Sequence, residues 1–302
     1  MAVKIVLPGA VMTVQDGGRY GYQEAGVQVS GAMDQMSFRN ANYLVGNEET
    51  EAVLEVTLFG GMLEFTEDTI VAVTGADMGP MVDEEPVEMN CPLLIKKGQI
   101  LALGMTRQGC RTYLAFAGGI DVPLVMGSRS TNLKCAFGGY GGRALKAGDV
   151  LKLGKPKLSF DQVKKRRTKG IETSKIIEVH AVPGPQQEYF TEAGEKAFYN
   201  GTYTITDQSD RMGYRLEGPR AESKNGTDII SDAIPLGAVQ IPPSGQPIVL
   251  LADRQTTGGY AKIAVVCSFD IPKLVQGRPG DKVRLLKTDV KTAQKLYRKQ
   301  ER

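Results

Sequence analysis

The chain has 302 residues, of which 41% are hydrophobic and 24% are charged, so it can bury a sizeable core and is not globally disordered. The formal net charge is only +3, and no basic stripe with interleaved aromatic residues occurs, which argues against nucleic-acid binding. No apolar run approaches the roughly 20 residues of a membrane helix, and no signal peptide is visible. We therefore expect a cytoplasmic protein with no membrane contact.

Cysteine and histidine are too sparse for most metal chemistry. The four cysteines are Cys91, Cys110, Cys135 and Cys267, and none forms a C-x-x-C pair. This pattern favours reduced thiols and argues against a disulfide framework or a structural zinc site. His180 is the only histidine, so metal sites with several histidines are excluded. We expect no metal site, and His180 at a strand end is more often structural than catalytic.

The first predicted element is a helix that follows Asp34, a suitable N-cap, and stops at Gly46-Asn47. A second helix is predicted near Pro185, with proline in the first turn. A third is predicted in the basic tail that starts at Val290. Between and around them, short β-branched runs separated by glycine turns predict strands. These runs are residues 70–74, 112–117, 150–153, 176–179, 203–206, 247–252 and 261–266.

A local echo suggests where the chain divides. Gly148–Leu153 resembles Gly280–Leu285, and each is a glycine turn that leads into a strand. A polar stretch containing Lys164-Lys165-Arg166-Arg167 follows the first copy and is typical of a solvated linker. The sequence therefore predicts a mainly β protein with barrel-like or sandwich domains. The predicted limits are an N-terminal domain at 1–155, a linker at 156–174, a C-terminal domain at 175–289 and a basic tail at 290–302.

The segment Asp253–Tyr260 is the strongest candidate for a functional loop. It follows the strand-like run 247–252 and contains polar side chains and two adjacent glycines without a core-forming residue. Glycine pairs let backbone N–H groups approach a ligand oxygen closely, and paired donors stabilise developing negative charge. Such a loop at the mouth of a β domain is suited to a small polar ligand.

Other polar clusters beside glycines or prolines have similar chemistry. Arginines in them fit a carboxylate or phosphate in a bidentate way. Each cluster alone is more often a turn or a surface ion pair, and together they indicate a site for an anionic molecule with a carbonyl group. No phosphate-loop motif G-x-x-x-x-G-K-[ST] is present. The clusters are Gln15–Gly21, Ala117–Ile120, Gly127–Thr131, Ser209–Leu216 and Gln240–Pro242.

These clusters, with two further motifs at Ser30–Asp34 and Ala41–Asn47, resemble a known family over nearly the whole chain. It is the biotin-dependent carboxyltransferase-like family, also called allophanate hydrolase subunit 2, which includes the C subunit of 5-oxoprolinase and the antagonist of a sporulation-kinase inhibitor. The resemblance implies two cyclophilin-like β-barrel domains. It also implies work in a complex with the B subunit of 5-oxoprolinase, which is kinase-inhibitor-like, and with the A subunit. A homo-oligomer remains open.

Three functions follow from the resemblance. In the first, ATP with Mg activates the amide oxygen of 5-oxoproline in the complex, and water then opens the ring to give glutamate. In the second, the chain transfers a carboxyl group from carboxybiotin to urea or a related amide. In the third, it is a regulator that binds a kinase inhibitor. We favour the first and expect no biotin on this chain, because Lys134 and Lys146 lack the Met-Lys-Met context of a biotin carrier.

Residue roles are predicted from motif position and side-chain chemistry. The substrate-orienting, catalytic group is Asp253, Gln255, Thr256 and Tyr260. Arg211 is the predicted anion partner, and Gly258 and Gly259 are the predicted backbone donors. The remaining predicted substrate-binding residues are Gln240, Gly118, Gly119, Arg19 and Ser128.

Overall fold

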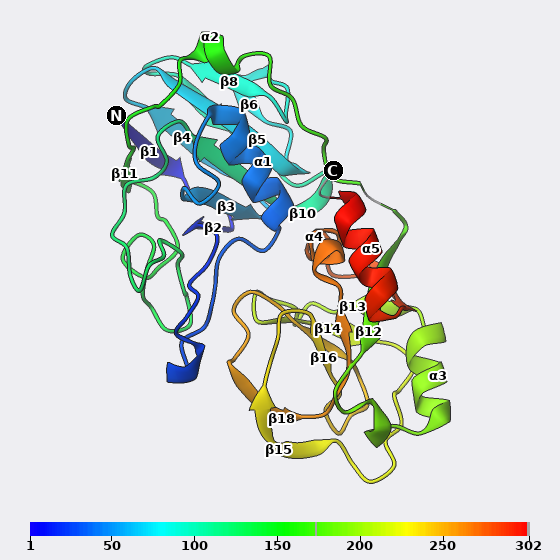
Figure 1. The fold of residues 1–302 in the computed structure, drawn as a ribbon. Coiled ribbons are helices and arrows are strands. Elements are labelled where there is room, and N and C mark those ends of the chain that lie inside the picture. The colour runs from blue at the N-terminus through cyan, green and yellow to red at the C-terminus, as the bar shows by residue number, and fades with distance from the viewer. Residues whose placement is uncertain (173, 301–302) are drawn as a thin grey trace. The chain divides into compact units, whose positions relative to one another are not determined.

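The computed structural model describes residues 1–172 and 174–300, and the chain forms two compact units (Figure 1). Unit 1 contains Met1–Tyr20 and Ser30–Glu172. Unit 2 contains Gly21–Val29 and the described residues from Ser174 onward. The structure confirms a mainly β fold with a few helices. The domain limits predicted from the sequence stay a prediction, and they did not include the association of Gly21–Val29 with the second unit.

The strands of unit 1 form two separate sheets and not one closed barrel. A six-stranded sheet has the order β11-β1-β4-β9-β6-β7, and a five-stranded sheet has the order β2-β3-β10-β5-β8. Their strands are β1 Ala2–Leu7, β2 Val11–Gln15, β3 Val53–Thr57, β4 Met62–Phe65, β5 Thr69–Asp77, β6 Met81–Val82, β7 Glu85–Pro86, β8 Pro92–Ile95, β9 Ile100–Ala102, β10 Gln108–Phe116 and β11 Val150–Lys152.

The core of unit 1 follows from strand alternation. In β4 buried and half-buried residues alternate, and the buried residues Leu63 and Phe65 join the largest hydrophobic cluster. The helix α1 (Gln35–Val45) packs against β5 and β10, where Phe38 and Leu44 are buried in a second cluster (Figure 1). Burial of such a large apolar side chain contributes about 1.5–3 kcal/mol.

The predicted helix at Asp34 is confirmed with its caps. The Asp34 carboxylate accepts a hydrogen bond from the backbone N–H of Ser37, and Gly46 ends the helix in the left-handed conformation. The stretch predicted as a linker packs on unit 1: it contains a short helix, α2 (Phe160–Val163), and Val163 is fully buried. Thr173, at the end of that stretch, lies outside the described residues.

Unit 2 contains a closed barrel with the strand order β12-β19-β16-β17-β14-β13-β20. A separate two-stranded ribbon is formed by β15 and β18. The strands are β12 Ile176–Pro183, β13 Tyr203–Ile205, β14 Gly213–Glu217, β15 Asp228–Ala233, β16 Ala238–Gln240, β17 Ile248–Leu250, β18 Thr257–Tyr260, β19 Lys262–Val266 and β20 Lys282–Lys287.

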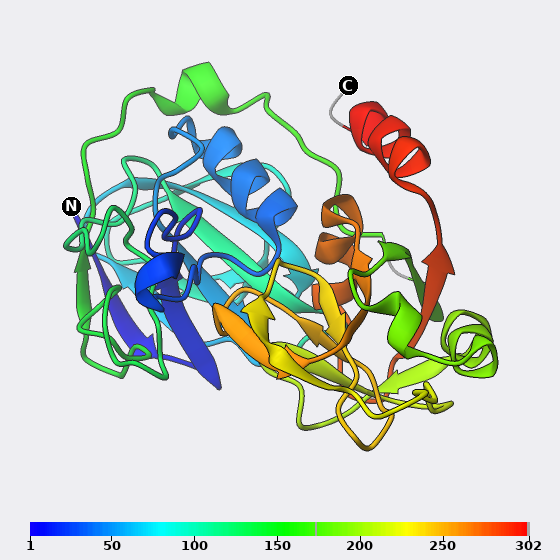
Figure 2. The same cartoon turned by 60° about the horizontal axis from the view of Figure 1, so that its bottom comes forward.

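The helices of unit 2 lie on the outside of the barrel (Figure 2). The prediction of a helix with Pro185 in its first turn is wrong. A 3-10 turn at Gln187–Tyr189 follows Pro185, and α3 (Glu192–Asn200) begins later because the Thr191 hydroxyl accepts a hydrogen bond from the Gly194 N–H.

Two more helices complete unit 2. The helix α4 spans Ile271–Val275, and the predicted tail helix is confirmed as α5 (Val290–Gln300). The last two residues of the predicted tail lie outside the described residues. In the described part of the chain, no helix is long and apolar enough to cross a membrane.

Candidate functional site

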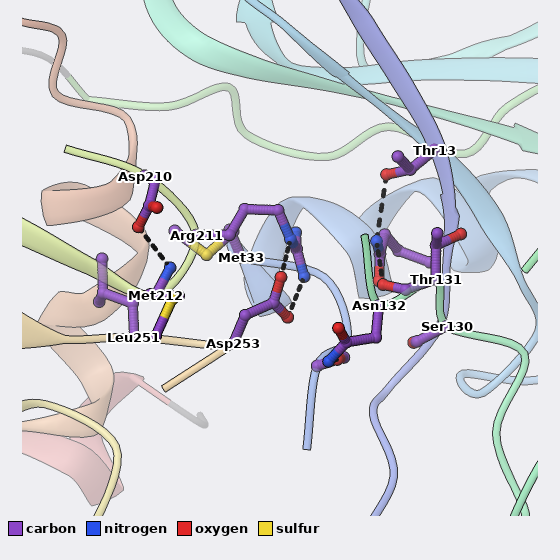
Figure 3. A network of polar contacts seen from close by, with 12 residues as sticks. Thr13, Met33, Ser130, Thr131, Asn132, Asp210, Arg211, Met212, Leu251 and Asp253 are labelled. Atoms are coloured by element: carbon purple, nitrogen blue, oxygen red, sulfur yellow. Dashed lines mark hydrogen bonds and ion pairs between the residues drawn. The ribbon is translucent and has the colours of Figure 1, made fainter. Parts of the chain in front are cut away.

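The loop that begins at Asp253 is anchored by an ion pair with Arg211. The strands β14 and β17 pair Gly213 with Leu250, and beyond their ends the Asp253 N–H still donates to the Arg211 carbonyl at 2.9 Å. This register places the two side chains together: Arg211 donates from Nε to Asp253 Oδ2 at 2.8 Å and from Nη2 to Oδ1 at 3.1 Å (Figure 3). Both side chains are nearly buried. Arg211 therefore has a carboxylate from its own chain as a bidentate partner.

A cavity of about 300 Å³ lies beside this loop, within unit 2. Its volume is at the lower end of the range for small-molecule sites. The Thr256 carbonyl accepts a hydrogen bond from the Ile234 N–H at 3.0 Å, which joins the loop to the end of the ribbon. The lining residues are Gln23, Val29, Ala233, Ile234, Pro235, Arg254, Gln255 and Thr256. Two predicted site residues, Gln255 and Thr256, therefore line a cavity of suitable size.

The second half of the loop is the strand β18, and it meets the barrel at Gln240. Gln240 donates from Nε2 to the Tyr260 carbonyl at 3.3 Å. A methyl group added at Gly258 would lie 2.8 Å from this Nε2 atom and 3.5 Å from Nε2 of Gln255, so glycine gives both amides close access to the strand. In the ribbon, Gly259 faces the longer stretch Ile229–Ser231, where the register between β15 and β18 shifts.

Unit 2 thus brings together eight predicted site residues on one loop, one strand end and the adjoining barrel strand. These residues are Arg211, Gln240, Asp253, Gln255, Thr256, Gly258, Gly259 and Tyr260. Sequence reasoning missed Gln28, whose Nε2 donates to the Asp253 carbonyl at 2.6 Å. No local signal marks Gln28, since it contacts Asp253 only because the segment Gly21–Val29 folds with unit 2.

Of the predicted site residues of unit 1, Ser128 belongs to a separate cluster that is centred on Asp16. The Asp16 carboxylate accepts hydrogen bonds from the Gly18 N–H at 2.9 Å, the Ser128 hydroxyl at 2.7 Å and the Arg129 N–H at 2.5 Å. The Ser130 hydroxyl is a further short contact. Ser128 is fully buried, so its hydroxyl holds two segments of unit 1 together rather than facing a cavity.

Arg19 is also fully buried in unit 1. Its guanidinium donates to the carbonyl oxygens of Val125 at 2.8 Å and Ser130 at 3.0 Å, and it lies over the Phe137 ring. Charged groups buried in this way need such partners to offset their desolvation. Through these contacts, Arg19 connects the segment after β2 to the loop 125–137. Its predicted contact with the substrate stays a prediction.

Gly118 and Gly119 lie after β10, and their N–H groups have partners inside unit 1. The Gly118 N–H donates to Asn47 Oδ1 at 2.8 Å, and the Gly119 N–H donates to the Phe116 carbonyl at 2.9 Å. Both residues have positive φ angles, of 91° and 72°. The glycine pair therefore forms a tight turn whose N–H groups are bonded within unit 1.

Replacing Gly118 with alanine is expected to lower the free energy of unfolding by about 3 kcal/mol or more, since a left-handed φ costs about 1–2 kcal/mol and a backbone clash adds to it. The new Cβ would lie 2.4 Å from the Gly154 carbonyl oxygen. Gly148→Ala is the matched control, because Gly148 has a φ of 89° with nothing within 4 Å of a Cβ. Equal losses in a urea titration of the two variants would contradict this account.

His180 is bound to a buried carboxylate at the edge of the barrel. Its Nδ1 lies 2.7 Å from Asp270 Oδ2, and its backbone N–H donates to the same oxygen at 2.7 Å. Asp270 is fully buried and also pairs with Lys273 at 2.8 Å. Burial, followed by the charge of Asp270, raises the pKa of the nearby Cys267 thiol to about 11. Cys267 is therefore a poor nucleophile, and the contacts of His180 fit a structural role.

Other cavities of similar size lie elsewhere in the described residues. Among residues 1–172 and 174–300, no cluster of three or more histidine, cysteine, aspartate or glutamate side chains is arranged to hold a metal ion. A second cavity, of about 400 Å³, lies in unit 1 and contains Asp77, Asn90 and Arg107. None of the residues predicted from the sequence lines that cavity.

Known proteins similar to this chain were found by sequence and by structure, and both sets contain the same domain. The chain is 40% identical to the C subunit of 5-oxoprolinase from Escherichia coli, over 99% of this chain and 96% of that protein. It is 38% identical to the protein of the same name from Haemophilus influenzae, over 96% of this chain and 92% of that protein. The crystal structure of Kluyveromyces lactis urea carboxylase matches 99% of this chain with a TM-score of 0.91 and 34% identity, but only 28% of that protein is covered.

A family model described as the carboxyltransferase domain, subdomain A and B, matches residues 25–287. This range includes both the loop Asp253–Tyr260 and its partner Arg211. The resemblance stated from the motifs is therefore confirmed: the chain belongs to the carboxyltransferase domain A and B family.

Proposed function

We propose that this chain is the C subunit of an ATP-dependent 5-oxoprolinase, in which it works with the B subunit to activate 5-oxoproline for hydrolysis to glutamate by the A subunit. The observation that carries the proposal is that this chain and relatives named as the C subunit of 5-oxoprolinase match over nearly the full length of both proteins. Those relatives are covered over 96% and 92% of their own lengths, so the match extends over whole proteins and not over one domain of a larger enzyme.

The site in unit 2 has chemistry that suits this reaction. The carbonyl oxygen of a cyclic amide is a hydrogen-bond acceptor with partial negative charge, and amide or backbone N–H donors can bind and orient it. Gln240 and Gln255 bring amide groups to Gly258, beside a cavity of about 300 Å³. ATP with Mg is proposed as co-substrate of the whole complex, and the proposed use of ATP fits a cytoplasmic location.

The reaction assigned to the complex balances as a phosphoryl transfer followed by hydrolysis. The amide oxygen attacks the γ-phosphorus of ATP, and ADP leaves. A first water attacks the activated carbon, and the ring C–N bond breaks as the nitrogen takes up a proton, which leaves an acyl phosphate. A second water then attacks the same carbon, and phosphate leaves with the oxygen that came from the amide. We propose that four residues orient the substrate for the first step: Asp253, Gln255, Thr256 and Tyr260. Asp253 contributes by holding the Arg211 side chain in place through their ion pair.

Carboxyl transfer is the second candidate, and one observation favours it. The matching family model is described as a carboxyltransferase domain, and Kluyveromyces lactis urea carboxylase has the same fold over 99% of this chain. The match covers only 28% of that enzyme, however. Carboxyl transfer therefore also needs a biotin carrier and a biotin carboxylase in addition to the matched region.

The two candidates separate in a reconstitution experiment. We expect the complex of this chain with the B subunit to hydrolyse ATP only when 5-oxoproline is present, and addition of the A subunit to give glutamate. Omitting this chain is the control and is expected to remove the 5-oxoproline dependence. Carboxylation of urea in the presence of carboxybiotin, with no response to 5-oxoproline, would instead support the second candidate.

A further inference from the structure

The side chain of Lys262 is buried although it is charged, and its position in a strand does not explain this burial. It is the first residue of β19 and is only 1% exposed. Its backbone N–H donates to Gln186 Oε1 at 3.2 Å, so the main chain is satisfied. Its Nζ lies 3.2 Å from Asp232 Oδ2 and has no aligned hydrogen bond to any described residue. The ammonium group is thus buried with one charged partner and three donors to satisfy.

The ion pair with Asp232 offsets little of the cost of burying this charge. Taking an ammonium group out of water costs several kcal/mol, and a lysine is almost never fully buried unless it is well paired. The Asp232 side chain is 50% exposed, so water competes for its charge and weakens the pair. A gain in fold stability therefore does not explain why the Lys262 ammonium group is buried. A buried charge of this kind is typical of a binding or catalytic position.

The place of Lys262 in the barrel connects it to the proposed site. In the β16–β19 ladder its cross-strand partner is Gln240, and directly opposed residues of antiparallel strands point to the same face. In the β15–β18 ribbon, Asp232 is the partner of Gly258. Lys262 therefore lies at the junction of ribbon and barrel, opposite Gln240, and its ion-pair partner Asp232 lies opposite Gly258.

We propose that Lys262 binds the carboxylate of the substrate, and that Asp232 occupies this position until the substrate replaces it. The exchange is of one carboxylate for another, so the buried ammonium group keeps a partner in both states. Asp232 can move into water because it is half exposed and lies on a two-stranded ribbon beside an irregular register. The inference rests on the proposed function and narrows the substrate class to cyclic amides that carry a carboxylate.

The Asp232 carboxylate is suited to this exchange. The close approach of the Lys262 ammonium group, followed by the hydrogen bond from the Ala233 N–H, lowers the pKa of Asp232, so the carboxylate is charged at neutral pH. Gln186 also reaches Asp232 Oδ2, at 3.4 Å, so an amide donor stands beside the position that an incoming carboxylate would take. A purely structural ion pair would give Lys262 an effect on stability but none on the choice between charged and neutral ligands.

The test compares 5-oxoproline with 2-pyrrolidinone, the same ring without the carboxylate. Dissociation constants are measured by calorimetry on the intact complex of this chain with its partner subunits. Lys262→Gln is expected to weaken binding of 5-oxoproline by about tenfold or more and to leave 2-pyrrolidinone unchanged, since one charged hydrogen bond is lost. Asp232→Asn is expected to tighten 5-oxoproline binding, because the competing carboxylate is gone.

Lys196→Gln is the matched control, because it removes an exposed lysine of unit 2 that pairs with Glu192 on the helix surface. It should change neither constant. The proposal is overturned if wild type does not prefer the acid, if Lys262→Gln keeps that preference, or if Asp232→Asn fails to tighten binding. A complex that shows the Lys262-dependent preference but does not hydrolyse ATP with 5-oxoproline would contradict the proposed function and leave the role of Lys262 standing.

Discussion

Replacing Asp253 with alanine is expected to lower the free energy of unfolding of unit 2 by about 3–5 kcal/mol, because a buried charge loses its partner. The same change should abolish ATP hydrolysis that depends on 5-oxoproline. Arg211 would lose two hydrogen bonds, of 2.8 and 3.1 Å, and the loop would lose its anchor to the end of β14. Urea unfolding of the chain and ATP hydrolysis by the complex measure the two effects.

A double variant separates stability from function at this pair. Combining Arg211→Met with Asp253→Leu removes both charges and keeps apolar bulk, so most of the lost stability should return. The 5-oxoproline dependence of ATP hydrolysis should stay absent, because the polar groups that orient the loop are gone. Full activity in the double variant would show that the ion pair only stabilises the fold, and it would contradict the assignment of Asp253 to the site.

Replacing Asp16 with alanine is expected to destabilise unit 1 by about 3–5 kcal/mol, since several buried donors lose their acceptor at about 1–3 kcal/mol each and relax only in part. The carboxylate is 5% exposed and accepts bonds from residues 18 and 128–130 of the chain. Loss of these bonds should detach the loop that contains Ser128 from the end of β2. Thermal unfolding monitored by circular dichroism measures the effect.

Asp121→Ala serves as the control for Asp16, because Asp121 is an exposed aspartate in the same unit. Its removal is expected to change stability by less than about 0.5 kcal/mol. A similar small loss in the Asp16 variant would mean that water replaces the carboxylate among its donors. The proposed role of Asp16 as the centre of a buried hydrogen-bond cluster would then be wrong.

Features set by neighbouring residues were predictable from the sequence. The helix α1 begins after Asp34 and ends at Gly46 because both caps act within one turn of the chain. The apolar runs that predict strands, such as 70–74 and 112–117, coincide with most of β5 and β10. The helix near Pro185 was misplaced because Thr191, six residues later, is the effective cap.

Features set by strand register were not predictable. Arg211 and Asp253 are 42 residues apart and meet only because β14 and β17 pair with Leu250 opposite Gly213. A lysine at the start of a strand, such as Lys262, is normally taken as a surface residue, and its burial depends on the closure of the barrel. The Gly118-Gly119 pair matched the pattern of an anion-binding turn, but its N–H groups are used within unit 1.

The most direct test of the central claim follows the amide oxygen of the substrate. The complete complex is supplied with ATP and 5-oxoproline that carries oxygen-18 in its ring carbonyl, and the released phosphate is analysed by mass spectrometry. The proposed activation transfers the phosphoryl group to that oxygen, so the label should appear in the released phosphate. We predict that labelled phosphate, together with glutamate, forms only when this chain is present. Glutamate and labelled phosphate formed equally well without this chain, or phosphate that never carries the label, would contradict the account.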